Sequence, residues 1–156
     1  MRIGFGKDIH KLEKGTGLVI GGILIPCEFR SVAHSDGDAL IHAISDAILG
    51  AAALNDIGYY FPDNDKNTEN MDSKIILSTV LNLINGQYNI CNIDCVVTLE
   101  KPKLSNVRNE IIQSVGKLLN LDTKKISIKF KTNEGLGDIG KSKAYEAEAI
   151  CLLEDK

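Results

Sequence analysis

Two hydrophobic periodicities alternate along the chain and limit the folds it can adopt. Within residues 2–11 the apolar side chains share one parity, which predicts a strand with two different faces; they are Ile3, Phe5 and Ile9. Residues 90–99 alternate in the same way, whereas residues 107–119 repeat with the period of a helix. A chain that switches between the two patterns predicts a sheet with packed helices.

The remaining segments extend this pattern. Residues 18–20 and 23–25 flank Gly21-Gly22 and predict a hairpin. We expect helices over 39–54, capped by Asp36 or Asp38, over 73–85, and from Ser105 or Asn106 onward. Strands are expected over 126–130 and 144–153, and a polar loop over 55–72. The order predicts one α+β domain, residues 1–156, in which helices cover one face of a mixed β-sheet.

A sheet covered on one face leaves its other face open. The strands over 90–99 and 144–153 are rich in apolar side chains: Cys91, Ile93, Cys95, Val97, Tyr145, Ala147, Ala149 and Cys151. We hypothesise a homo-oligomer that packs sheet against sheet and buries the open face.

The composition excludes several classes of protein. The net charge is −3, so no general basic surface would attract nucleic acid or anionic lipid. No apolar run reaches the ~18 residues of a membrane-spanning helix, and the N-terminus lacks the apolar core of a signal peptide. The four cysteines lack the CxxC spacing of zinc sites and are expected to be reduced. We expect a cytoplasmic protein, or one of the plastid stroma if the chain is a processed form.

Asp8, His10 and His42 are candidate metal ligands. Asp8 and His10 are two residues apart on the first strand, so their side chains share a face. His42 shares a helical stripe with Asp38 and Asp46. If that stripe faces the strand, Asp8, His10 and His42 form a three-ligand set that leaves one position of tetrahedral zinc open. A solvated strand end and a solvent-facing stripe are the alternatives. Asp46 either accepts a hydrogen bond from His42 or pairs within the helix.

Other polar motifs are unspecific when each is taken alone. His34 and Ser35 precede a helix N-terminus, which suits phosphate, although a plain capped turn fits equally. In the loop over 55–72, the carboxylates of residues 63 and 65 suit a polyol or a solvated turn. In the run 131–134, Glu134 suits a hard cation such as Mg²⁺, and Thr132 suits a phosphoryl oxygen.

Together these motifs resemble the 2-C-methyl-D-erythritol 2,4-cyclodiphosphate synthase family over residues 1–153. The matching segments are Arg2-Ile3-Gly4-x-Gly6-x-Asp8-x-His10, Ala33–Asp38, His42–Leu54, Asp56–Asp65 and Lys131–Glu134. The resemblance implies a fold like that of Bacillus chorismate mutase, and a homotrimer with active sites between neighbouring subunits. It also implies zinc held by Asp8, His10 and His42, and a second ion, Mg²⁺ or Mn²⁺, near Glu134.

The resemblance further implies the reaction of a phosphorus–oxygen lyase. The 2-phosphate of 4-diphosphocytidyl-2-C-methyl-D-erythritol 2-phosphate attacks the β-phosphorus of the same molecule, CMP leaves, and the cyclic diphosphate forms. His34 and Thr132 would stabilise the transition state. The residues implied to bind substrate are Asp8, Ile9, His10, His34, Ser35, Asp56, Ile57, Gly58, Phe61, Pro62, Asp63, Asn64, Asp65, Leu99, Glu100, Lys101, Pro102, Lys103, Leu104, Ser105, Lys131, Thr132, Asn133 and Glu134.

Residues 137–141 depart from the family pattern. Gly-Asp-Ile-Gly-Lys stands where the family has Gly-Phe-Thr-Gly-Arg, a stretch that lines an isoprenoid diphosphate cavity on the threefold axis. Lysine lacks the fork with which arginine grips a diphosphate, and we hypothesise that Lys141 pairs with Glu148 instead. The rival functions are a zinc-dependent phosphoester hydrolase and a non-catalytic metal-binding or assembly protein.

Overall fold

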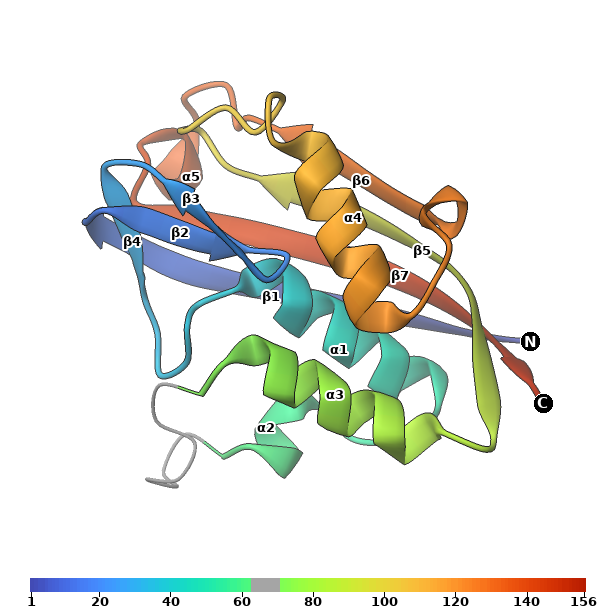
Figure 1. Cartoon of the computed structure of the whole chain (residues 1–156). Coiled ribbons are helices and arrows are strands. Elements are labelled where there is room, and N and C mark those ends of the chain that lie inside the picture. Colours follow the sequence, from blue (N-terminus) through green and yellow to red (C-terminus); the bar gives the residue numbers. More distant parts are fainter. Residues whose placement is uncertain (63–70) are drawn as a thin grey trace.

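Helices lie on one side of a five-stranded mixed sheet in the computed structural model, which describes residues 1–62 and 71–156 (Figure 1). The elements in chain order are β1 (Arg2–Lys14), β2 (Gly17–Ile20), β3 (Ile23–Pro26), β4 (Phe29–Val32), α1 (Ala39–Ala51), α2 (Ile57–Tyr60), α3 (Ser73–Ile84), β5 (Tyr88–Thr98), α4 (Arg108–Leu119), the 3₁₀ helix η2 (Thr123–Lys125), β6 (Ile126–Lys131), α5 (Gly137–Gly140) and β7 (Ala144–Asp155). The expected α+β architecture is confirmed.

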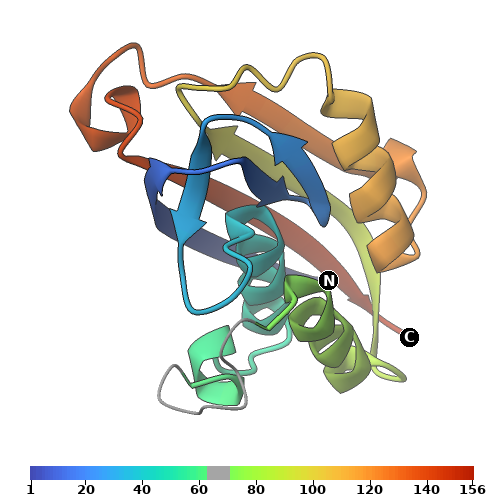
Figure 2. The ribbon, with the colours of Figure 1, turned by 60° about the vertical axis from the view of Figure 1, so that its left-hand side comes forward.

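The sheet order is β4-β1-β7-β5-β6, and only β5 and β6 run parallel. Their connection passes through α4, as a parallel pair requires a crossover. Helix α1 packs on β1 and β7, α4 packs on β6, and α3 packs on α1 (Figures 1 and 2). The hairpin β2-β3 forms a separate two-stranded sheet.

Glycines in β1 let α1 lie directly against the strand backbone. A Cβ atom at Gly4 would stand 1.8 Å from the carbonyl oxygen of Ala47, and one at Gly6 would stand 2.1 Å from that of Ala43. Gly4 and Gly6 are two residues apart, which is ~6.6 Å along a strand, and Ala47 and Ala43 are four residues apart, which is ~6 Å along a helix. The two close contacts therefore have nearly the same spacing on the strand and on the helix. The next inward residue of β1 is Asp8, and its Oδ2 lies 2.9 Å from Nδ1 of His42, the residue that precedes Ala43 in α1.

Asp38 joins the start of α1 to the β2-β3 hairpin. Its fully buried carboxylate caps the helix by accepting from the N–H of Ile41, and it also accepts from the N–H groups of Gly21, at 3.0 Å, and Gly22, at 2.6 Å. Burial outweighs these donors and raises the pKa of Asp38 to about 6, with a further contribution from the nearby Asp36 carboxylate. Asp38 is thus the helix cap, one of the two candidates that the sequence predicted, but it is buried and does not lie on an exposed polar stripe.

Two predicted helix boundaries differ from the observed ones, and short elements without a periodic pattern were not predicted. The helix predicted over 39–54 ends at Ala51, because Ala53 adopts a left-handed backbone (φ 57°) without any sequence signal for it. The helix predicted from Ser105 or Asn106 begins at Arg108 and has no side-chain cap. The four-residue elements β4, α2 and α5 were not predicted, and α2 lies inside the segment expected to be a loop.

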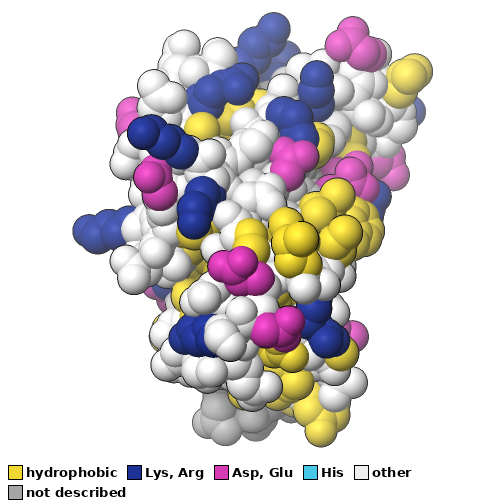
Figure 3. All heavy atoms as spheres, turned by 90° about the vertical axis from the view of Figure 1, so that its right-hand side faces the viewer, with side chains coloured by type: hydrophobic (Ala, Val, Ile, Leu, Met, Phe, Trp, Pro, Cys, Tyr) yellow, Lys and Arg dark blue, Asp and Glu magenta, His cyan; other side chains and the backbone are white. Residues whose placement is uncertain are grey.

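The uncovered sheet face carries apolar side chains that belong mainly to β1. Ile3 is 74% exposed and Phe5 59% exposed, and Ile9 and Ile150 are exposed on the same face. Seen toward the two chain termini, hydrophobic side chains gather at the surface (Figure 3). The strand residues expected to leave apolar surface on both faces are instead mostly buried under the helices: Ile93, Cys95, Val97, Tyr145, Ala147, Ala149 and Cys151.

The predicted pair of Lys141 and Glu148 is wrong. Glu148 projects from the uncovered face of β7 and pairs at 3.2 Å with Lys7 of the neighbouring strand β1. Lys7 also pairs at 3.2 Å with Glu146, two residues earlier on the same face. Strand register therefore decides that Lys7 is the partner of Glu148. Lys141 follows the last residue of α5 and does not pair with Glu148.

We expect the substitution Gly6→Ala to destabilise the fold by about 3 kcal/mol or more. The new methyl group would meet backbone atoms of α1, which cannot move aside as a flexible side chain does. Urea unfolding measures the loss. Gly50→Ala is the matched control, because a Cβ atom there meets nothing closer than 3.8 Å and alanine favours the helix. Equal stability of the two variants would contradict the close packing of α1 on β1.

Candidate metal centre and active site

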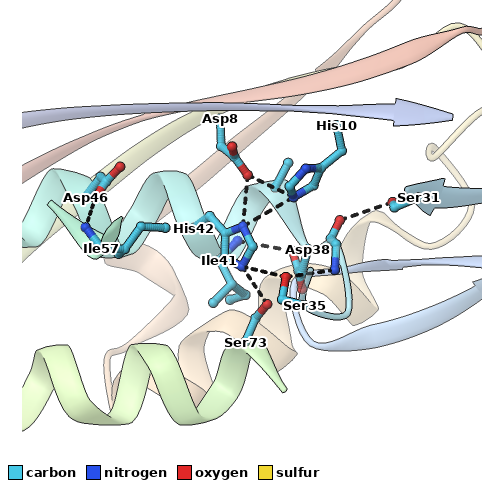
Figure 4. Close-up of polar contacts among 12 residues, drawn as sticks. Asp8, His10, Ser31, Ser35, Asp38, Ile41, His42, Asp46, Ile57 and Ser73 are labelled. Atoms are coloured by element: carbon cyan, nitrogen blue, oxygen red, sulfur yellow. Dashed lines mark hydrogen bonds and ion pairs between the residues drawn. The ribbon is translucent and has the colours of Figure 1, made fainter. Parts of the chain in front are cut away.

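Asp8 and His10 of β1 and His42 of α1 bring three ligand atoms to one point (Figure 4). Nδ1 of His42 lies 2.9 Å from Oδ2 of Asp8, and Nε2 of His10 lies 3.0 Å from the same oxygen. The two ring nitrogens are 3.3 Å apart. Among the residues that the structure describes, no other group of histidine, cysteine and acidic side chains has this convergence.

The electrostatics of the cluster favour a bound cation. Burial alone would raise the pKa of Asp8, but hydrogen bonds from His10 and His42 outweigh it and hold that pKa well below its usual range. Burial would lower the pKa of His42, yet the Asp8 carboxylate raises it above the ordinary value. One carboxylate and two imidazoles form a donor set that zinc accepts, and its convergence without a fourth side chain in the described cluster fits an ion with one open position.

The second nitrogen of the His42 ring faces α3 and the loop before α1. Nε2 lies 2.9 Å from Oγ of Ser73 and 3.3 Å from Oγ of Ser35. The sequence had singled out Ser35 as a possible phosphate donor but gave no signal for Ser73, which the fold brings to His42 from the first turn of α3.

Asp46 does not act in either of the two ways the sequence had suggested. Its carboxylate accepts a hydrogen bond of 2.8 Å from the backbone N–H of Ile57, the first residue of α2 (Figure 4). Burial raises the pKa of Asp46 despite this donor. Asp46 therefore fixes the segment 56–58 against α1, and no hydrogen bond joins it to His42 in the described structure.

A cavity of about 370 Å³ opens beside the three-residue cluster. It brings together eight residues that the sequence had singled out: Asp8, His10, His34, Ser35, His42, Ile57, Gly58 and Phe61. Ala33 also lines it and had been noted only as the first residue of the motif Ala33–Asp38. Val32, Met71 and Ile76 were missed. These three are apolar and belong to no polar motif, so only their position in the fold identifies them.

A second cavity, of about 320 Å³, lies where β5 and β6 end and α4 begins. Seven of its residues were predicted: Leu99, Lys103, Leu104, Ser105, Lys131, Thr132 and Glu134. Arg108 and Phe130 were missed, and the Arg108 guanidinium stands 5.3 Å from the centre of the Phe130 ring. The two cavities share no lining residue, so one chain does not unite Thr132 and Glu134 with the Asp8 cluster in a single cavity.

The other described residues of the predicted substrate set lie outside both cavity linings. The side chain of Ile9 is on the uncovered sheet face, opposite to Asp8 and His10. Asp56 caps α2, and Glu100 accepts from the backbone N–H of Asn133 at 3.0 Å, which holds the turn after β6. Lys101 and Pro102 are joined by a cis peptide bond. Pro62 precedes Asp63, Asn64 and Asp65, which lie outside the described residues.

Comparison with known proteins finds full-length similarity. The model of the YgbB family matches residues 1–154. A 2-C-methyl-D-erythritol 2,4-cyclodiphosphate synthase of Clostridium botulinum (strain Okra / Type B1) is 50% identical over 99% of this chain and 100% of its own. A solved synthase of the same description is 40% identical, with a TM-score of 0.90 over 98% of this chain and 100% of that chain. The Plasmodium falciparum IspF, solved as a CDP complex, is 42% identical, with a TM-score of 0.86 over 99% of this chain and 96% of that chain.

We expect Asp46→Ala to release α2 while leaving the metal ligands in place. The lost hydrogen bond to a charged acceptor is worth ~2 kcal/mol, and its loss exposes the N–H of Ile57 to solvent. Amide hydrogen exchange at Ile57 should accelerate at least tenfold, with zinc affinity unchanged. Asp46→Asn, which keeps an acceptor oxygen, is the control. Unchanged exchange at Ile57, or loss of zinc, would show that Asp46 has a different role.

Proposed function

The chain belongs to the YgbB family, and from this premise we propose that it converts 4-diphosphocytidyl-2-C-methyl-D-erythritol 2-phosphate to 2-C-methyl-D-erythritol 2,4-cyclodiphosphate and CMP. This is a step of the methylerythritol phosphate route to isoprenoids. The observation that carries the proposal is the Asp8–His10–His42 cluster beside a cavity, in a chain similar from end to end to synthases of that name.

The metal centre would be formed by Asp8, His10 and His42. When bound, zinc would supply positive charge that neutralises a substrate phosphate at its open coordination position. The protein's own contribution is to keep three ligand atoms together before any ion arrives, since β1 and α1 are packed rigidly at the glycines of β1.

The residues around the first cavity suit the phosphate and the methylerythritol part of the substrate. His34 and Ser35 lie on its wall, just ahead of the N-terminus of α1, where donors and the helix dipole favour a phosphate. Segment 56–58, fixed by Asp46, would meet the ribose, and residues 61–65 would meet the methylerythritol part. In this arrangement His34 stabilises the charge that develops as the phosphate oxygen attacks.

The residues around the second cavity suit the diphosphate and the base. Lys131 would donate to phosphate oxygens, and Glu134 would hold a second divalent ion, Mg²⁺ or Mn²⁺. The Thr132 hydroxyl donates to Glu134 at 2.9 Å in this structure and would turn to a phosphate oxygen once Glu134 holds the ion. Residues 99–105 would frame the cytosine. The CDP bound to the Plasmodium falciparum relative supports a cytidine diphosphate moiety in the substrate.

The chemistry requires no nucleophile from the protein. An oxygen of the 2-phosphate forms a bond to the β-phosphorus, the bond from that phosphorus to the CMP oxygen breaks, and CMP leaves with the electron pair. The protein's side chains orient two anionic groups that repel each other in water, so catalysis rests on positioning and charge neutralisation.

A complete site would need two subunits. Because the two cavities share no residue, a neighbouring copy would supply the Thr132 and Glu134 side against the Asp8 cluster of the first. The apolar side chains on the uncovered sheet face, Ile3, Phe5, Ile9 and Ile150, support an assembly that packs sheet against sheet. We propose a homotrimer with active sites between subunits. Its place would be the cytoplasm, or the plastid stroma for a processed chain.

The test of the proposed function is product analysis by phosphorus NMR. Incubation with the diphosphocytidyl substrate, Zn²⁺ and Mg²⁺ should release CMP and the cyclic diphosphate in equal amounts. His42→Ala should abolish both zinc binding and turnover, whereas His34→Ala, whose side chain is no metal ligand, should keep zinc and lose at least tenfold in kcat. An acyclic phosphate product would show a hydrolase, and zinc without turnover would show a non-catalytic metal-binding protein.

We expect Glu134→Gln to raise the Mg²⁺ concentration needed for half-maximal activity about tenfold or more, because the amide cannot supply the anionic oxygen that Mg²⁺ prefers. Zinc content should be unchanged, since Glu134 lies outside the zinc cluster. Steady-state rates over a Mg²⁺ titration measure the effect. Glu110→Gln, an exposed acid on α4, serves as the control. An identical Mg²⁺ titration for the Glu134 variant and its control would contradict the assignment.

A further inference from the structure

Ser73 is buried at the start of α3 although the helix does not need it as a cap. Its side chain is fully buried, one of few polar side chains in the described chain with that property. The cap of α3 is Asp72, whose carboxylate accepts from the N–H of Lys74. A buried hydroxyl that is not spent on capping requires other hydrogen-bond partners, because an unpaired one is costly.

The two partners of the Ser73 hydroxyl are Asp36 and His42. Oγ of Ser73 makes a short hydrogen bond to Oδ1 of Asp36 and lies 2.9 Å from Nε2 of His42. The backbone N–H of Ser73 donates to the other oxygen of Asp36 at 3.0 Å. Residues from the loop before α1, from α1 and from α3 thus form one chain of contacts, Asp36–Ser73–His42.

The direction of each hydrogen bond in this chain follows from what the groups can donate. An ionised carboxylate only accepts, so the hydroxyl proton of Ser73 points to Asp36. Oγ of Ser73 is then an acceptor toward His42, so Nε2 of the imidazole carries the proton. Without an ion, Nδ1 of His42 donates its proton to Asp8, and a metal ion bound between Asp8, His10 and His42 would replace that proton. With Nε2 protonated, Nδ1 is then the nitrogen that offers a lone pair to the ion.

The alternative partner of Nε2 is more weakly placed. Ser35 Oγ lies 3.3 Å from this nitrogen and also accepts from the N–H of Gly37 at 3.2 Å. Its contact with His42 is longer than that of Ser73, and among the described residues no carboxylate accepts from its hydroxyl and fixes the direction of the proton. Ser73 is therefore the group that orients the ring.

We propose that Ser73, itself oriented by Asp36, is a positioning residue that holds His42 in the tautomer and ring orientation needed to bind the metal ion. This inference rests on the proposed zinc centre and adds to it a residue from α3. It predicts a loss of metal affinity without loss of any ligand atom, and outer partners of this kind typically change affinity about 10- to 100-fold.

The substitution Ser73→Ala tests the inference with the fold preserved. The backbone N–H of residue 73 still reaches Asp36, Asp72 still caps α3, and alanine favours a helix. Zinc affinity of the purified protein, measured by competition with a chelator of known affinity, should fall about 10- to 100-fold. Ser78→Ala, an exposed serine on the same helix, should bind zinc like the wild type.

Nitrogen-15 NMR of the His42 ring reports the protonation of Nε2. A serine that only helps the fold would leave this signal unchanged when it is replaced. In the wild type Nε2 should show the shift of a protonated nitrogen with slow proton exchange, and in Ser73→Ala that proton should exchange at least tenfold faster. The double variant with Asp36→Asn should bind zinc about as weakly as the weaker single variant, and clearly less weakly than the product of the two single effects, because both substitutions break the same chain.

The outcomes separate the two proposals. A wild type that binds no zinc overturns the metal centre itself. A wild type that binds zinc tightly, together with a Ser73→Ala variant of equal affinity and an unchanged His42 ring spectrum, leaves the metal centre standing and overturns the role of Ser73.

Discussion

The close contact of α1 with β1 is the constraint on which the site depends. With a side chain at Gly4 or Gly6, α1 would have to stand off the strand, since backbone atoms of Ala47 and Ala43 occupy the space that a Cβ atom needs. The approach of strand and helix brings Asp8 and His10 within hydrogen-bond reach of His42. Three ligands from elements about 30 residues apart thus meet through packing, before any ion contributes binding energy.

Buried polar contacts then fix the start of α1 from several sides. Asp38 holds the hairpin turn through the N–H groups of Gly21 and Gly22, and Asp36 holds α3 through Ser73. Both carboxylates lie close enough to His42 to favour its charged form, so the interior beside the cluster is electronegative. Such a site attracts cations, and cations in turn neutralise phosphates. A chain of net charge −3 can therefore act on an anionic substrate without a basic surface.

Much of the fold and part of the site could be predicted from local pattern. The alternation of apolar and polar side chains predicted the strands β1, β5 and β7. The two-residue spacing of Asp8 and His10 was enough to predict that they share one face of β1. Predictions about partners were less successful. Asp46 binds the backbone of Ile57, and Glu148 pairs with Lys7, because hydrogen-bond partners depend on tertiary proximity and strand register that a single sequence does not encode locally. Ser73 gave no signal for the same reason.

The sequence by itself determined the α+β class, the candidate ligands and the family resemblance, because periodicity and motif spacing are local properties of the chain. Only the tertiary structure decided that α1 approaches β1 closely enough for three ligands to converge, and that α3 supplies a partner for the outer nitrogen of His42. It also decided that the two cavities remain separate within one chain. These outcomes depend on distances between segments remote in sequence, and such distances are set by backbone packing rather than by neighbouring residues.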